Sequence, residues 1–183
     1  MTQIDSGRTM TTVIVGTPLP WMPVVDDAQW ENAAITMFGE LAAASENDID
    51  PERTAHELRA AARDLETGQR IIASLALEQR WPQLFIVEAG EPADDVDPAV
   101  LAGAAEPGPF GLPEVERDGT GVAIATRRDL LDDGSVSITV CVVRRTPGLD
   151  VRVLWRTTEL DLVEIVRSEL VALSSAVHVE DAS

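Results

Sequence analysis

The strongest constraint on the fold is a two-residue repeat of apolar side chains near the C-terminal end of the chain. Apolar residues alternate with small or polar ones over residues 136–142, and Val151, Val153 and Trp155 continue the apolar positions after the turn. Between these runs, residues 146–149 have the sequence Thr-Pro-Gly-Leu, which places Pro and Gly where a type II turn needs them. Successive side chains of a strand point to opposite faces, so the pattern predicts an antiparallel hairpin with one apolar face.

Other short apolar runs predict further strands of the same sheet. They lie at residues 71–77, 84–88 and 122–127, with a short final run at 176–179. The run at 71–77 is rich in Ala and Leu, so its periodicity also allows a continued helix. Together with the hairpin, these segments predict an antiparallel sheet of roughly five to seven strands.

Helical spacing of apolar residues predicts three longer helices, at residues 27–44, 51–67 and 159–174. Asp26 or Asp27 is expected to cap the first helix, and Asp50 the second, whose first turn holds a proline. Thr158 and Asp161 have the spacing of a capping box before the last helix. Helices and antiparallel strands together predict an α/β (α+β) fold, with the sheet sandwiched by helices.

The length of the chain suits one domain. Its 183 residues are 45% hydrophobic, which is enough for an ordinary core. We expect a flexible N-terminal tail at residues 1–11 and a single α/β sandwich domain at residues 12–183. Within it, residues 90–113 are rich in Asp, Glu, Pro and Gly and predict a long acidic loop, with one short helix after Asp97.

The charge balance limits the classes of partner. The formal net charge is −18, because 32 acidic residues face 14 basic ones, all of them arginine. Such a chain repels nucleic acid and anionic membranes, and it favours a neutral or basic protein. One cysteine excludes an internal disulfide, and neither a signal peptide nor a membrane-spanning run is visible, so we expect a cytoplasmic protein.

Residues that could carry chemistry are few. His56 follows Glu52 by one helical turn, but two ligands do not define a metal site. Cys141 lies in mid-strand, where nothing lowers its pKa, and His178 has the pattern of a packed strand residue. The acids at 94–97 lack the glycine and distal glutamate of a calcium loop.

Motifs for phosphate binding and for nucleophilic serine are also missing. The chain contains no lysine, which excludes a P-loop, and it has no nucleophile elbow. We therefore predict no enzymatic activity, no cofactor and no metal. The alternative is a small enzyme that uses carboxylates, and Glu52, His56 and Glu57 are its candidate group.

Basic residues are concentrated in the strands near the C-terminal end. Residues 119–158 contain six arginines and four acids, whereas residues 1–118 contain 22 acids and seven arginines. These six are candidate partner-binding residues, because the guanidinium group of Arg forms bidentate hydrogen bonds with carboxylates at interfaces. The alternative is an internal set paired with the acidic helices. The six residues are Arg127, Arg128, Arg144, Arg145, Arg152 and Arg156.

Three local features carry a resemblance to a known type of protein. They are a Pro-Trp segment at residues 19–23, the hairpin at 136–144 and 151–156, and the exit Trp-Arg-Thr-Thr-Glu-Leu at 155–160. With this order of elements, the chain resembles small proteins of high-GC actinobacteria and, more broadly, PsbP-like α/β/α sandwiches. The resemblance implies protein binding, and some actinobacterial members are accessories of type VII (ESX) secretion. It carries over no site residue.

The sequence thus favours a cytoplasmic protein-interaction module without enzymatic activity, as an accessory or chaperone-like factor of a secretion system. The alternative from a different class is an immunity protein that neutralises a toxin by presenting carboxylates to a basic site. The accessory reading places the partner on the arginine-bearing sheet, and the immunity reading places it on the acidic helices and the 90–113 loop. Self-association stays open.

Overall fold

The computed structural model describes residues 11–14, 21–45, 48–77, 80, 82–93 and 95–180. Residues 1–10, which form most of the predicted tail, lie outside this part of the chain. Within it the elements follow one another as β1 (Thr11–Ile14), β2 (Trp21–Val24), α1 (Ala28–Ser45), α2 (Pro51–Arg63), β3 (Gln69–Ser74), β4 (Gln83–Gly90), α3 (Pro98–Leu101), β5 (Glu114–Arg117), β6 (Val122–Leu130), β7 (Val136–Thr146), β8 (Leu149–Thr157), a 3-10 turn (Leu160–Leu162), α4 (Val163–Ala176) and β9 (Val177–Glu180).

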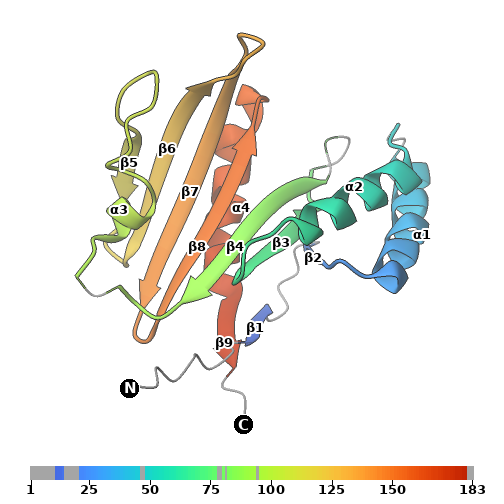
Figure 1. The fold of residues 1–183 in the computed structure, drawn as a ribbon, viewed down its shortest axis with the longest axis horizontal. Helices are drawn as coiled ribbons and strands as arrows, with labels where there is room; N and C mark the ends of the chain where they lie inside the picture. Colours follow the sequence, from blue (N-terminus) through green and yellow to red (C-terminus); the bar gives the residue numbers. More distant parts are fainter. Residues whose placement is uncertain are drawn as a thin grey trace, which may run out of the picture.

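Seven of the described strands form one antiparallel sheet, in the order β2-β3-β4-β8-β7-β6-β5. This confirms the predicted mixed α/β class and its antiparallel sheet. The sheet twists across the molecule, with β5 at one edge and β2 at the other (Figure 1). The strands β1 and β9 form a separate antiparallel pair.

The β7–β8 hairpin is the centre of the sheet, and its turn is where the sequence predicts it. Gly148 has a φ of 83°, a left-handed conformation that glycine adopts without a steric penalty. The two strands pair from Thr146 opposite Leu149 to Ile138 opposite Thr157. Alternation therefore places Val140, Val142, Val153 and Trp155 on a common face, where each is at most 2% exposed.

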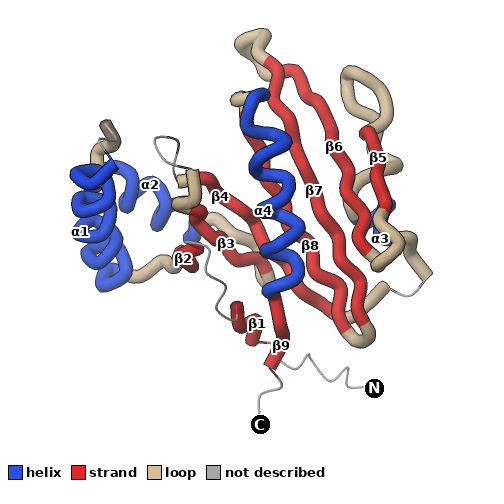
Figure 2. The backbone as a smooth tube through the Cα atoms, turned by 180° about the vertical axis from the view of Figure 1, so that it is seen from behind, coloured by secondary structure: helices blue, strands red, loops and turns tan. Residues whose placement is uncertain are grey.

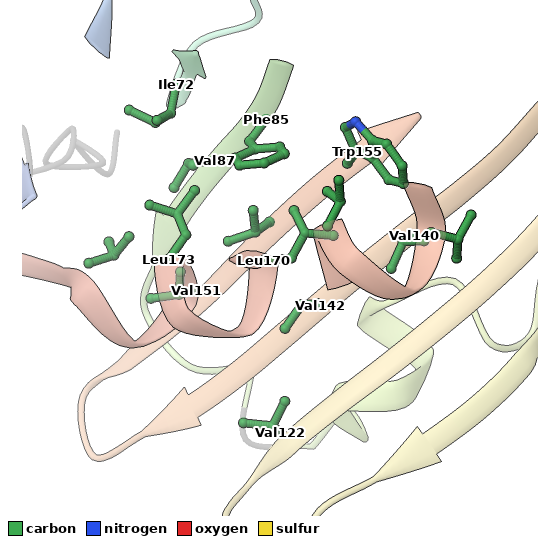
Figure 3. Packing of buried hydrophobic residues seen from close by; sticks show 14 of the residues in the cluster. Ile72, Phe85, Val87, Val122, Val140, Val142, Val151, Trp155, Leu170 and Leu173 are labelled. Atoms are coloured by element: carbon green, nitrogen blue, oxygen red, sulfur yellow. The ribbon is translucent and has the colours of Figure 1, made fainter. Parts of the chain in front are cut away.

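The helix α4 covers that face of the sheet. It lies across β7 and β8 in the view from behind (Figure 2), and it contacts both strands. Its Val166, Leu170 and Leu173 are fully buried in the main core. Figure 3 shows Leu170 and Leu173 among the strand residues. This main core confirms the predicted stripe of the last helix and the predicted apolar face of the hairpin.

On the opposite face, the helices of the described residues cover the sheet only at its two ends. The hairpin of α1 and α2 packs its Phe38 and Leu58 against Ile71 and Ala73 of β3. At the other end, the short α3 packs against β6 and β7. Helices thus lie on both sides of the sheet, as the sequence predicts for a sandwich.

Several helix boundaries follow the predicted capping residues. The Asp27 carboxylate accepts hydrogen bonds from the backbone N–H groups of Gln29 and Trp30, at 2.7 and 3.0 Å, so Asp27 caps α1. Asp50 caps α2 by accepting from Arg53 N, and Asp97 caps α3 by accepting from Ala99 N.

Two helix ends differ from the prediction. The helix α2 ends at Arg63, not near residue 67, because Asp64 closes the last turn and Gly68 adopts a φ of 92° in the turn that leads into β3. The predicted capping box of Thr158 is wrong. The N–H of Glu159 bonds instead to the Thr157 hydroxyl, and the chain passes through a 3-10 turn before α4 begins. Trp30 of α1 is half-buried and donates its indole N–H to Pro23 O.

Candidate functional site

A strip of the sheet lies between the α1–α2 hairpin and α3, and no helix of the described chain covers it (Figure 1). We call it the open strip. It belongs to β4 and β8, which are neighbours in the sheet, and Ile86 pairs with Leu154 while Glu88 pairs with Arg152. Its outward side chains are Leu84, Ile86, Glu88, Arg152, Leu154 and Arg156.

The two faces of these strands have very different exposure. Phe85 and Val87 of β4 and Val153 of β8 face α4 and are at most 1% exposed. On the open strip, Leu84 is 37% exposed and Arg156 is exposed, while the other four side chains are half-buried. The apolar residues Leu84, Ile86 and Leu154 are thus left partly in contact with solvent.

A cavity of about 420 Å³ opens at one end of the open strip, and we call it the acidic pocket. The turn between α2 and β3 forms one wall, and α3 with the chain that follows β4 forms the other. Glu88 and Arg152 belong to both the strip and the pocket. The lining residues are Glu66, Thr67, Gly68, Gln69, Glu88, Ala89, Gly90, Glu91, Ala93, Leu101, Val143, Asp150 and Arg152.

Two of the four carboxylates in the acidic pocket are held by neighbouring groups. Asp150 accepts from Arg145 Nη2 at 2.7 Å and from Ala93 N at 3.1 Å. The Arg145 guanidinium lowers the pKa of Asp150. Glu88 accepts from Gln69 Nε2 at 2.7 Å and from Arg152 Nη1 at 3.2 Å.

The other two carboxylates of the pocket are free within the described chain. Neither Glu66 nor Glu91 forms an ion pair or accepts a side-chain hydrogen bond from a described residue, and both are exposed. Asp150 and Glu88 are paired with the guanidinium groups of Arg145 and Arg152, so Glu66 and Glu91 leave two uncompensated negative charges at the pocket. The pocket therefore favours a cationic group.

The six candidate arginines are divided between the two faces of the sheet. Arg127, Arg145, Arg152 and Arg156 lie on the face of the open strip, whereas Arg128 and Arg144 lie on the face of α4. Alternation along β8 places Arg152, Leu154 and Arg156 together on the face of the open strip.

Each candidate arginine donates to a group of the same chain. Arg127 bonds to Asp129 and Glu106, Arg128 pairs with Glu114, Arg144 bonds to Ser175, Arg145 bonds to Asp150, Arg152 bonds to Glu88, and Arg156 bonds to Ser137. The partners of Arg144 and Arg156 are hydroxyl groups. Partner binding by the six arginines stays a prediction.

Cys141 lies under the strip beside a smaller cavity of about 120 Å³. It is 3% exposed, and burial raises the pKa of its thiol, although Arg152 Nε lies 3.4 Å from its Sγ. A thiol with a raised pKa is a weak nucleophile at neutral pH. Cys141 is thus a buried mid-strand residue without a lowered pKa, as the sequence predicts.

The three residues considered for carboxylate catalysis, Glu52, His56 and Glu57, are all exposed on the surface of α2. His56 Nδ1 lies 3.1 Å from Glu31 Oε1, and the His56 side chain is 76% exposed. Glu57 pairs with Arg53 at 2.8 Å. Neither of the two cavities above is lined by Glu52, His56 or Glu57.

The residues considered as metal ligands do not converge in the described part of the chain. Asp97 caps α3 and pairs with Arg117, whereas Asp94 and the side chain of His178 lie outside the described residues. Within the described ranges, no three His, Cys, Asp or Glu side chains are placed to hold a metal ion.

Sequence reasoning did not single out the acidic pocket. Glu66 lies in a turn and Glu91 in a loop, and each is one of many exposed acids in the sequence. Only Glu88 carried a usable signal, because it is a charged residue in an otherwise apolar strand.

None of the helices described in the structure has the length and apolarity that crossing a membrane requires. Comparisons with protein-family models, curated proteins and solved structures find no match to this chain.

Proposed function

We propose that the protein is a non-enzymatic interaction module that binds another protein on the open strip. The observation that carries this proposal is the contrast between the two faces of β4 and β8. One face is sealed by α4, and the other leaves Leu84, Ile86 and Leu154 partly exposed between two helical walls. Partly exposed apolar side chains with Arg nearby are typical of protein interfaces.

The ion pairs that the arginines form within the chain narrow down where the bound protein would lie. Four of the six guanidinium groups are engaged by carboxylates of the same chain, so a surface of free arginines does not support the proposal. Arg156, which bonds only to the Ser137 hydroxyl among the described residues, stays the best placed arginine for a partner carboxylate. It lies on the open strip itself.

Affinity capture from the source cells tests the proposal when it compares two matched variants. Leu84→Arg places a charge on the strip at a side chain that is 37% exposed. Ile165→Arg makes the same kind of change on α4, where the side chain is 53% exposed. We expect the captured partner to be lost with Leu84→Arg and retained with Ile165→Arg, while near-ultraviolet circular dichroism shows that both variants fold.

A partner that is retained by Leu84→Arg, or that is lost only with Ile165→Arg, contradicts binding on the strip. Turnover of a small metabolite by the purified protein contradicts the absence of enzymatic activity.

The finer roles rest on the sequence resemblance. We propose the PsbP-like likeness and the secretion-accessory role as finer parts of this function, and they are supported by an antiparallel sheet that carries helices on both sides. Toxin neutralisation by an immunity protein is the second candidate. It is favoured by the two free carboxylates of the acidic pocket, since such proteins present acids to a basic site.

A further inference from the structure

The acidic pocket continues the open strip and does not form a separate site. Glu88 and Arg152 line the pocket, and they are also the last pair of outward side chains at that end of the strip. A segment of a partner that lies along β4 and β8 therefore reaches the pocket with one of its side chains. This inference rests on the proposed function, since it assumes that the strip binds a protein.

The pocket combines an apolar floor with an acidic rim. Val143 is 1% exposed, and with Ala89 and Leu101 it provides apolar surface inside the cavity. The free carboxylates of Glu66 and Glu91 stand at the two walls. A long basic side chain fits an apolar floor with an acidic rim, because such side chains bury their methylene groups against apolar surface and keep their charge near polar groups.

We infer that the acidic pocket receives a lysine or arginine side chain of the partner protein, held by Glu66 and Glu91. Charge complementarity determines this choice, because Asp150 and Glu88 are paired with Arg145 and Arg152, whereas the carboxylates of Glu66 and Glu91 have no described partner in a chain with a net charge of −18. An acidic or phosphorylated partner segment is repelled there. A free small cation would leave the apolar side chains of the strip uncovered, so the occupant is a protein segment.

The test uses a random library of dodecamer peptides panned against the full chain, because the partner has no assigned sequence. We expect the selected peptides to share a Lys or Arg flanked by apolar residues. Synthetic copies of these peptides should bind the Glu66→Gln/Glu91→Gln variant about tenfold more weakly than the unaltered protein, as measured by fluorescence anisotropy.

A matched variant separates the pocket from the general field of the protein. Glu40→Gln/Asp132→Asn removes the same two charges at exposed acids that have no described partner, and we expect it to bind like the unaltered protein. Equal weakening by both double variants overturns the inference. Selected peptides without a basic residue, or a library that yields no binder, overturn it as well.

The Leu84→Arg variant distinguishes failure of the inference from failure of the proposed function. Peptides that lose binding with Leu84→Arg but not with Glu66→Gln/Glu91→Gln bind the strip without using the pocket, so only the inference fails. Peptides that bind all variants equally lie elsewhere on the molecule, and both proposals then fail. Thermal unfolding of each variant confirms that the comparison is made between folded proteins.

Discussion

Asp26 joins the two helices of the N-terminal hairpin by charge-assisted hydrogen bonds. It lies just before α1, and its carboxylate accepts from Arg59 Nε at 2.8 Å and from Arg63 Nε at 3.2 Å, both in α2. The Arg63 and Arg59 guanidinium groups lower the pKa of Asp26 to about 2. The ionised form is therefore favoured in the folded protein.

The lowered pKa of Asp26 predicts how its contribution to stability depends on pH. An aspartate in the unfolded chain has a pKa of about 3.9, so the stabilisation is fully present above that pH. It is lost as the pH falls through the folded pKa of about 2. We expect Asp26→Asn to lower the Tm at pH 7, and the difference from the unaltered protein to shrink between about pH 4 and pH 2.

Thermal unfolding by circular dichroism at several pH values measures this difference. Glu40→Gln is the control, since Glu40 is an exposed acid of α1 without a described partner. A Tm difference for Asp26→Asn that is unchanged down to pH 2 would contradict the role of the ion pairs.

Glu169 of α4 is a buried carboxylate with neutral hydrogen-bond donors. It is 8% exposed, and it accepts from Trp21 Nε1 at 2.7 Å and from the Ser74 hydroxyl. It thereby links α4 to β2 and β3. We expect Glu169→Leu to lower the free energy of unfolding by about 1–3 kcal/mol, because the indole N–H and the hydroxyl lose their acceptor.

Glu169→Gln keeps the size of the side chain and one acceptor oxygen. We therefore expect a smaller loss in the free energy of unfolding, measured by urea denaturation. An equal loss in both variants would show that the two hydrogen bonds do not account for the effect.

At the scale of elements, sequence patterns predicted the central strands well. The β7–β8 hairpin has alternation over most of its length and a turn with Pro and Gly in the required positions, so local and tertiary preferences agree there. Capping was predicted where one acid stands before a helix, as at Asp50. It failed at Thr158, because the neighbouring Thr157 offers a competing hydroxyl to the backbone.

The candidate site could not be predicted in the same way. The acidic pocket combines residues from a turn, a loop, α3 and four strands, so its composition depends on the tertiary arrangement. The sequence shows that six arginines lie on the C-terminal strands. Their division between the two faces of the sheet, and the groups that they bond to, depend on the strand register and the tertiary structure.

The β5–β6 connection shows how a single glycine supports an element. Gly121 precedes β6 with a φ of 88°, and a Cβ atom there would lie 3.0 Å from the carbonyl oxygen of Arg145 in β7. Its own carbonyl accepts from Arg145 N at 3.1 Å. Both the backbone conformation and the close approach of the strands require glycine.

We expect Gly121→Ala to lower the free energy of unfolding by about 1–3 kcal/mol in denaturant titrations, since the side chain adds strain and a steric contact. Gly119→Ala is the matched control two residues earlier, where a Cβ atom would meet nothing within 4 Å. Equal stability of the two variants would contradict this account.

At the scale of the whole molecule, α4 and the α1–α2 hairpin pack on two separate clusters of apolar residues. The main core lies between α4 and strands β4, β6, β7 and β8. The second cluster lies between the α1–α2 hairpin and β3, on the other face and near the β2 edge of the sheet (Figures 1 and 2). The hairpin contacts the sheet mainly through β2 and β3, so little surface joins it to the centre.

This arrangement predicts that the molecule opens in two steps under native-state hydrogen exchange. Amides of α1 and α2 should exchange at lower denaturant than those of β7 and β8, because the hairpin can leave β3 without disrupting the core under α4. Leu58→Ala should lower protection in the hairpin alone, since Leu58 is buried only in the second cluster. Leu170→Ala should lower protection throughout, because Leu170 lies in the main core. Simultaneous loss of protection in α2 and β7 in both variants would instead indicate a single cooperative unit.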